Sequence, residues 1–109
     1  MKKKWGQDID GNYNGGSFGV SVSLNGNGDM LLVGDNTYGP FNEGQIKCFK
    51  LSDNVWVQLG SEVIGLNKDD FAGSSVALSN SGNKIVFGSP ASLTGEGEGV
   101  VRFFNFDTN

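Results

Sequence analysis

Carboxylate pairs are the residues of this sequence that could do chemistry. Asp69-Asp70 and Glu96/Glu98 each place two acids close together, and such pairs can share general acid and base work in a hydrolase. They stand in glycine-rich segments where no neighbour would separate their pKa values, so we interpret them as solvated loop charges. With no histidine, and Cys48 as the sole cysteine, a base-activated nucleophile and a zinc site both lack their usual residues. We therefore expect a protein that is not an enzyme, with a loop-carboxylate hydrolase as the alternative.

Oxygen-bearing side chains alternate along a segment near the N-terminus. Asp8, Asp10, Asn12 and Asn14 stand at every second position, and oxygen ligands of this kind suit Ca²⁺. The segment has neither the glycine turn nor the bidentate glutamate of an EF-hand loop. We predict a solvated polar loop and no cofactor, with calcium bound by Asp8, Asp10 and Asn12 as the alternative.

Aromatic and amide side chains gather in segments that we expect to be loops, and loops carry binding surfaces on β-scaffolds. Rings and amides together suit contacts with a carbohydrate or with another protein. If the protein has a ligand surface, we expect it to include Tyr13, Asn14, Asn36, Tyr38, Phe41, Asn42 and Asn67.

The charge balance restricts the class of partner. The 109 residues include 8 Lys and Arg against 12 Asp and Glu, which gives a net charge of -4. Phosphate binding needs clustered Lys and Arg, and the only such cluster is Lys2-Lys3-Lys4 at the N-terminus. No run approaches the roughly 18 apolar residues of a membrane span, and no apolar signal segment follows the lysines. We expect no nucleic-acid partner and no membrane span, and we leave the cellular location open.

The chain repeats itself at an offset of 54 residues. Laying residues 6–34 over residues 60–88 gives eight identities in 29 positions without a gap. After one inserted residue the match resumes at an offset of 55, with residues 44–51 over residues 99–106. We predict a single domain, residues 1–109, made of two copies of one unit, about residues 5–54 and about residues 55–109.

Short runs rich in β-branched and aromatic residues, bounded by Gly, Asn, Asp and Ser, predict the strands of each copy. No long segment has the 3.6-residue apolar period of a helix. Glycines between the runs favour tight hairpin turns, so each copy should be a four-stranded antiparallel meander. We expect an all-β protein with strands at about residues 18–24, 30–35, 45–51, 55–59, 74–78, 84–89 and 100–106.

Four-stranded antiparallel units that repeat every roughly 40 to 50 residues are typical of β-propeller blades, which bury both faces of each sheet. The run Leu31-Leu32-Val33 is apolar on successive positions, as a doubly covered sheet requires. Phe18-Gly19-Val20-Ser21-Val22 and Phe71-Ala72-Gly73-Ser74-Ser75-Val76 resemble the FG-GAP repeat, the blade unit of integrin-α-like propellers. Trp56-Val57-Gln58-Leu59-Gly60 is similar to a segment of its bacterial and marine variants; in the first copy this segment is shortened to Trp5-Gly6-Gln7.

The resemblance carries implications for calcium and for location. Many members of the family hold Ca²⁺ in an aspartate-rich loop after this element, which implies Asp35 as a further ligand. Residues 35–43 and 92–98 lack the full spacing of that loop, so calcium stays an alternative here. Related propellers are often extracellular or attached to the cell surface.

Two blades are fewer than the roughly 4 to 8 of a closed propeller, and two alone would expose apolar sheet faces that mark association sites. The segment around Trp5 matches that around Trp56, an outer strand, and the second copy has three predicted strands up to Phe106. We expect head-to-tail homo-oligomers with strand exchange between protomers. Three chains would close six blades and four would close eight, with the trimer preferred. The predicted interface comprises Trp5, Gly6, Gln7, Ile9, Val101, Phe103, Phe104 and Phe106.

The sequence thus predicts a non-enzymatic β-propeller that self-assembles into a ring and serves in binding or scaffolding, for a protein or carbohydrate ligand. One alternative is a calcium-dependent adhesion module of the integrin type. The other is a fragment of a longer propeller whose loop carboxylates give hydrolase activity.

Overall fold

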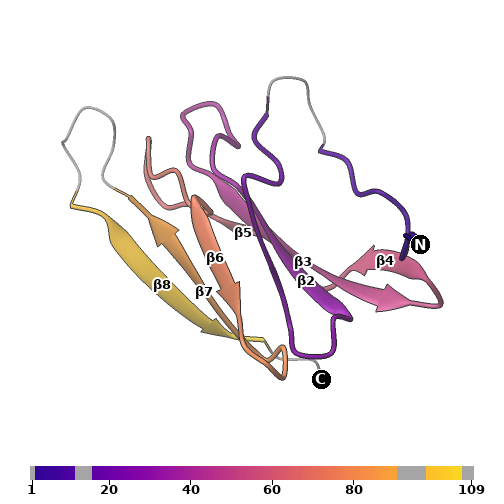
Figure 1. Ribbon diagram of the computed structural model, residues 1–109. Helices are drawn as coiled ribbons and strands as arrows, with labels where there is room; N and C mark the ends of the chain where they lie inside the picture. The colour runs from indigo at the N-terminus through magenta and orange to yellow at the C-terminus, as the bar shows by residue number, and fades with distance from the viewer. Residues whose placement is uncertain (1, 12–15, 91–97, 107–109) are drawn as a thin grey trace.

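The computed structural model describes residues 2–11, 16–90 and 98–106. In this part of the chain it contains eight β-strands and no helix, which confirms the prediction of an all-β protein (Figure 1). No helix in the described ranges is therefore available to span a membrane. The strands are β1 (Ser21–Leu24), β2 (Met30–Asp35), β3 (Gln45–Ser52), β4 (Val55–Gln58), β5 (Val63–Ile64), β6 (Ser75–Leu78), β7 (Lys84–Ser89) and β8 (Val100–Asn105).

The strands form two antiparallel sheets that pack against each other (Figure 1). In the first sheet β1, β2, β3 and β4 follow one another, and β5 pairs with the part of the β3 edge that β4 leaves open. The second sheet has the order β6-β7-β8. The first sheet thus contains a four-stranded meander, whereas the described residues supply only three strands to the second.

Short polar side chains and left-handed residues close the hairpins of the first sheet. Asn25 Oδ1 accepts hydrogen bonds from the backbone N–H groups of Asp29 and Met30, both at 3.0 Å, between β1 and β2. Asp53 and Asn54 join β3 to β4 with φ values of 50° and 64°. A two-residue turn with positive φ at both positions matches the twist of the strands that it connects, which explains why this hairpin is tight.

The main core lies between the two sheets. Leu32, Ile46 and Cys48 of the first sheet pack with Ile85 and Phe87 of the second. A second cluster lies on the opposite side of the first sheet, so apolar side chains occur on both of its faces. This cluster contains Val33, Phe49 and Trp56, with Ile9, Phe18, Leu31 and Leu51 packed against it.

Hydrogen bonds join β1 of the first sheet to the start of the second. Ser21 Oγ donates to the carbonyl of Gly73 at 2.6 Å, and the N–H of Leu78 donates to Ser23 Oγ at 3.0 Å. The backbone of Gly73 lies so close to Gly34 that a Cβ at position 34 would collide with the Gly73 carbonyl. A glycine at position 34 is therefore a condition for this sheet-to-sheet contact.

The two sheets have the same register at the offsets found in the sequence. Gly19 and Gly73 both have a φ of 92°, and their N–H groups donate to the carbonyls of Gly34 and Gly88 at 3.0 and 3.2 Å. Matching residue pairs include Ser21↔Gly34 with Ser75↔Gly88, Leu24↔Leu31 with Leu78↔Ile85, and Leu31↔Phe49 with Ile85↔Phe104. The second sheet therefore repeats the pairing of β1-β2-β3 residue by residue.

Each sheet has an inner face, in the core between the sheets, and an outer face, because successive side chains of a strand point to opposite sides. The outer face of the first sheet includes Val22, Leu24, Leu31, Val33, Lys47, Phe49 and Leu51. The outer face of the second sheet includes Ser75, Ala77, Lys84, Val86, Gly88, Val101, Phe103 and Asn105.

Candidate interaction surfaces

The acidic residues of the loops serve the loop structure itself. Asp70 Oδ2 accepts hydrogen bonds from the backbone N–H groups of Leu66 and Asn67, both at 2.9 Å. Asp69 Oδ1 accepts a hydrogen bond from Asn42 Nδ2 at 3.3 Å. The two carboxylates thus have separate partners. Of the other predicted acid pair, Glu98 is exposed and Glu96 lies outside the described residues.

The residues considered for calcium do not converge in the part of the chain that the structure describes. Exposed Asp8 forms an ion pair with Lys4 at 3.1 Å, and Asp10 is also exposed. Asp35 is buried in β2 and accepts a hydrogen bond from the N–H of Ser17 at 3.2 Å. Among residues 2–11, 16–90 and 98–106, no group of three or more His, Cys, Asp or Glu side chains could hold a metal ion. Asn12 lies outside these ranges.

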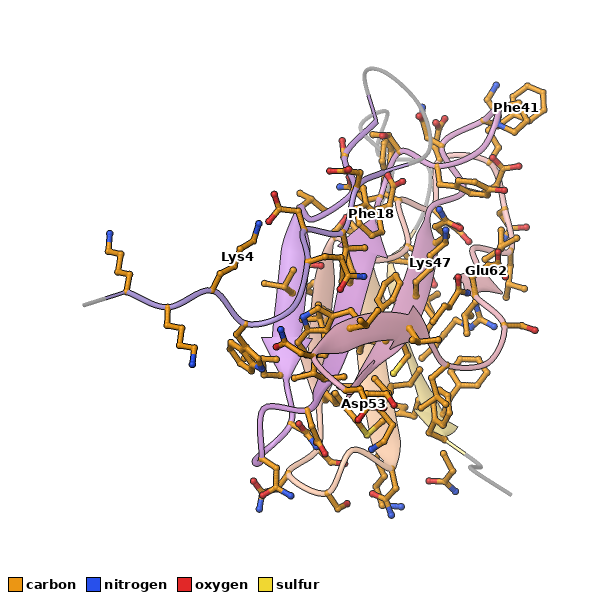
Figure 2. All side chains as sticks on the ribbon, turned by 90° about the vertical axis from the view of Figure 1, so that its right-hand side faces the viewer. Lys4, Phe18, Phe41, Lys47, Asp53 and Glu62 are labelled. Carbon is orange, nitrogen blue, oxygen red and sulfur yellow. The ribbon has the colours of Figure 1, made fainter. Side chains whose placement is uncertain are left out.

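The loop residues considered for ligand binding divide into two kinds. The side-chain amides of Asn36 and Asn42 hold loops together, since Asn36 Nδ2 donates to Ser74 Oγ at 3.0 Å and Asn42 Nδ2 to Asp69. Phe41 is exposed at the tip of its loop, with the Lys68 ammonium 5.8 Å from the ring centroid (Figure 2). Tyr38 is half-buried, Asn67 is exposed, and Tyr13 and Asn14 lie outside the described residues.

The N-terminal segment packs on the first sheet of the same chain and does not form a strand. The rings of Trp5 and Trp56 are 5.9 Å apart, centroid to centroid. The side chain of Gln7 donates to the carbonyl of Trp56 at 2.9 Å and accepts from its N–H at 2.8 Å, while the N–H of Gly6 donates to Asn54 Oδ1 at 3.1 Å. Ile9 packs on the outer face of the same sheet. Within the single chain, the segment around Trp5 therefore forms no strand.

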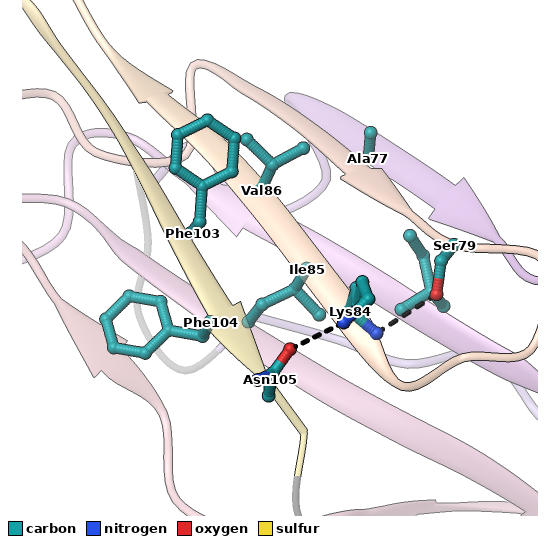
Figure 3. Close-up of a pocket in the computed structure, with 9 residues that line it drawn as sticks. Ala77, Ser79, Lys84, Ile85, Val86, Phe103, Phe104 and Asn105 are labelled. Carbon is teal, nitrogen blue, oxygen red and sulfur yellow. Dashed lines mark hydrogen bonds between the residues drawn. The ribbon is translucent and has the colours of Figure 1, made fainter.

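The outer face of the second sheet is apolar and open. Val101 is 59% exposed and Phe103 is 76% exposed. Figure 3 shows Phe103 beside Val86 on one side of the sheet, where they line a shallow hollow of about 400 Å³. Two predicted interface residues, Val101 and Phe103, lie here, whereas Phe104 and Phe106 pack against the core between the sheets.

The positions equivalent to this open face are buried in the first sheet. At the offset of 55, Ile46 corresponds to Val101 and Cys48 to Phe103, and they are only 2% and 5% exposed. Leu32, which corresponds to Val86 at the offset of 54, is fully buried. The difference arises because the second sheet covers these three residues, while no described residue covers their equivalents.

The outer face of the first sheet is exposed at positions whose equivalents in the second sheet are buried. Leu24 is 45% exposed, whereas its equivalent Leu78 is 9% exposed against the first sheet. The N-terminal segment covers this face in part, and it leaves a hollow of about 550 Å³ bordered by Trp5, Ile9, Val22 and other residues. The sequence had not indicated that Val22, Leu24, Ala77, Val86 and Gly88 line open faces, although the repeat offset relates Leu24, Val86 and Gly88 to the buried residues Leu78, Leu32 and Gly34.

The two open faces thus match the two halves of the contact inside the chain. The open face of the second sheet corresponds to the inner face of the first, and the open face of the first corresponds to the inner face of the second. Each open face also contains one lysine: Lys47 lies opposite Val33 on the first sheet, and Lys84, which donates to Asn105 Oδ1 at 2.9 Å, lies on the same face as Val86 on the second. In comparisons with known proteins, no family model, no curated protein and no solved structure matches this chain.

Proposed function

We propose that the protein is a non-enzymatic β-propeller scaffold whose copies assemble head to tail into a closed ring. The observation that carries the proposal is the exposure of Val101 and Phe103, whose equivalents Ile46 and Cys48 are buried between the sheets. In this proposal each sheet is a blade, and the open face of the second sheet packs on the open face of the first sheet of the next copy.

A second copy of this chain is the occupant that the repeat favours. The surface that already fits the inner face of the first sheet is the inner face of the second, and the chain presents equivalents of both. Burying one large apolar side chain contributes about 1.5–3 kcal/mol, so Val86, Val101 and Phe103 together supply a substantial driving force. A contact between two different faces is heterologous, and it closes into a ring when the rotation per copy divides a full turn.

Blade number limits the size of the ring. Closed propellers have roughly 4 to 8 blades, so three copies would give six blades and four would give eight. We favour the trimer, with an outer strand exchanged between protomers to complete the second sheet. The ring would present several copies of the loops that carry Phe41 and Asn67, as a scaffold for protein or carbohydrate ligands.

A charge placed on the open face of the second sheet tests this function. We expect Phe103→Asp to convert the assembly into folded single chains, because an aspartate buried between two sheets would be desolvated without a partner. Phe41→Asp is the matched control, since it also replaces an exposed phenylalanine but on a loop. Sedimentation velocity should give an unchanged assembly for Phe41→Asp. If the mass of Phe103→Asp equals that of the unmodified protein, this face takes no part in assembly.

A further inference from the structure

The second sheet has no counterpart of β4 among the described residues. In the first sheet β4 pairs with the outer edge of β3, and the register places Gln58 opposite Phe49 and Val57 opposite Lys50. The ladder continues beyond β4, since the N–H of Leu59 donates to the carbonyl of Cys48 at 2.8 Å. The corresponding edge of β8 pairs with no strand in the part of the chain that the structure describes.

The N-terminal segment occupies the same place on the first sheet as the segment after β4 occupies on the second. Gly6 and Gly60 both have positive φ, 79° and 73°. A Cβ on Gly6 would lie 3.2 Å from the Leu51 side chain, and one on Gly60 would lie 3.2 Å from the Phe106 ring. Leu51 and Phe106 are equivalent at the offset of 55, so Gly6 corresponds to Gly60 in space as well as in sequence. Residues 2–4 therefore correspond to residues 56–58, which are in β4.

Residues 2–4 are not placed against either sheet of their own chain. Lys2, Lys3 and Lys4 are exposed, and Figure 2 shows Lys4 on a segment that runs away from the sheets. Figure 1 places the N-terminus and β8 on opposite sides of the molecule. A strand formed by residues 2–4 can therefore reach the edge of β8 only in another copy.

We propose, on the basis of the ring assembly above, that residues Lys2–Lys4 of one copy add to the free edge of β8 in the preceding copy, the one whose second sheet packs on its first sheet. The β3-β4 register then places Lys4 opposite Phe104 of the partner subunit and Lys3 opposite Asn105 of the partner subunit. The N–H of Trp5 donates to the carbonyl of the partner's Phe103, as Leu59 does to Cys48. Main-chain hydrogen bonds hold such an added strand, and lysines suit an edge that stays in contact with water.

Cysteine pairing between two singly substituted chains tests this register. One chain carries Lys3→Cys, the other Asn105→Cys, and both carry Cys48→Ala so that no other thiol is present. Opposite residues of such a pair have Cα atoms about 5.5 Å apart, which a disulfide can span. After mixing and oxidation with diamide, we expect a two-chain band on a denaturing gel. The control replaces Lys3→Cys by Lys4→Cys, whose side chain points to the other face, and the band should be lost.

Light scattering before oxidation separates this inference from the proposed function. If the protein assembles but gives no two-chain band, or gives the same band with Lys4→Cys, the proposed strand addition is wrong. The proposed packing of the open faces is then unaffected. Single chains in solution overturn both. If Cys48→Ala does not fold, deletion of residues 2–4 in the unmodified background replaces the test. It should weaken assembly, whereas Lys2→Thr, Lys3→Thr and Lys4→Thr together, which keep the backbone, should not.

Discussion

A methyl group at Gly88 should block assembly without harming the single chain. Gly88 is the equivalent of Gly34, on which the Gly73 carbonyl of the second sheet rests. In the proposed ring the Gly19 carbonyl of the next copy rests on Gly88 in the same way. Among the described residues of one chain, a Cβ at position 88 would meet only the Ser75 hydroxyl, at 2.7 Å. The substitution is therefore best made as Gly88→Ala in a Ser75→Ala background, which removes that contact.

The expected magnitude follows from the cost of overpacking. Forcing an extra methyl group into a well-packed contact costs about 1–3 kcal/mol, which weakens each interface by about 5- to 150-fold. Sedimentation equilibrium over a range of concentrations measures this change against Ser75→Ala alone. Urea unfolding under dissociating conditions should give the two variants nearly the same free energy of unfolding.

Gly34→Ala is the internal control, because it places the same methyl group in the contact that already exists inside the chain. It should lower the free energy of unfolding of the chain itself by about 1–3 kcal/mol. The reasoning is refuted if Ser75→Ala/Gly88→Ala is folded and assembles as tightly as Ser75→Ala. Loss of folding in that double variant would instead contradict the open environment of Gly88.

Two further predictions concern the buried thiol and calcium. Burial raises the pKa of the Cys48 thiol from 9.0 to about 11, so the folded chain keeps a proton that the unfolded chain has lost. The free energy of unfolding, measured in urea, should therefore fall as the pH rises from 9.0 through about 11, and this part of the fall should disappear in Cys48→Ala. EDTA should leave the melting temperature unchanged in differential scanning calorimetry, because Asp8, Asp10 and Asp35 form no metal-binding group; a lower melting temperature, restored by Ca²⁺, would support the adhesion alternative.

The sequence predicted those strands best that are bounded by clear turn residues. The predicted runs 30–35 and 84–89 coincide with β2 and β7, which follow glycine-containing turns and are apolar on successive positions. The first strand begins at Ser21 and not at residue 18, because the N–H of Val20 closes a turn on the Ser17 carbonyl. The strand β5 has only two residues, and a run this short has no periodicity to detect.

The interaction surfaces were harder to predict, for two physical reasons. The sequence analysis matched Trp5 to Trp56 because both are tryptophans. The repeat offset of 54 instead aligns Trp5 with Leu59, and the equivalent surroundings of Gly6 and Gly60 in the structure agree with this offset. The loop residues Asn42 and Asp69 bind each other across 27 positions of sequence, and a contact of this kind depends on the tertiary fold. Phe103 was predicted as an interface residue because its apolar strand had no partner strand in the sequence. The exposure of its side chain agrees with that prediction.

The mass of the unmodified protein in solution tests the central claim most directly. Light scattering coupled to gel filtration should give three times the mass of one chain, or four times if the ring has eight blades, and a value that does not grow further with concentration. A folded protein with the mass of one chain at micromolar concentration would contradict the account, because Val101 and Phe103 would then be stable in contact with water.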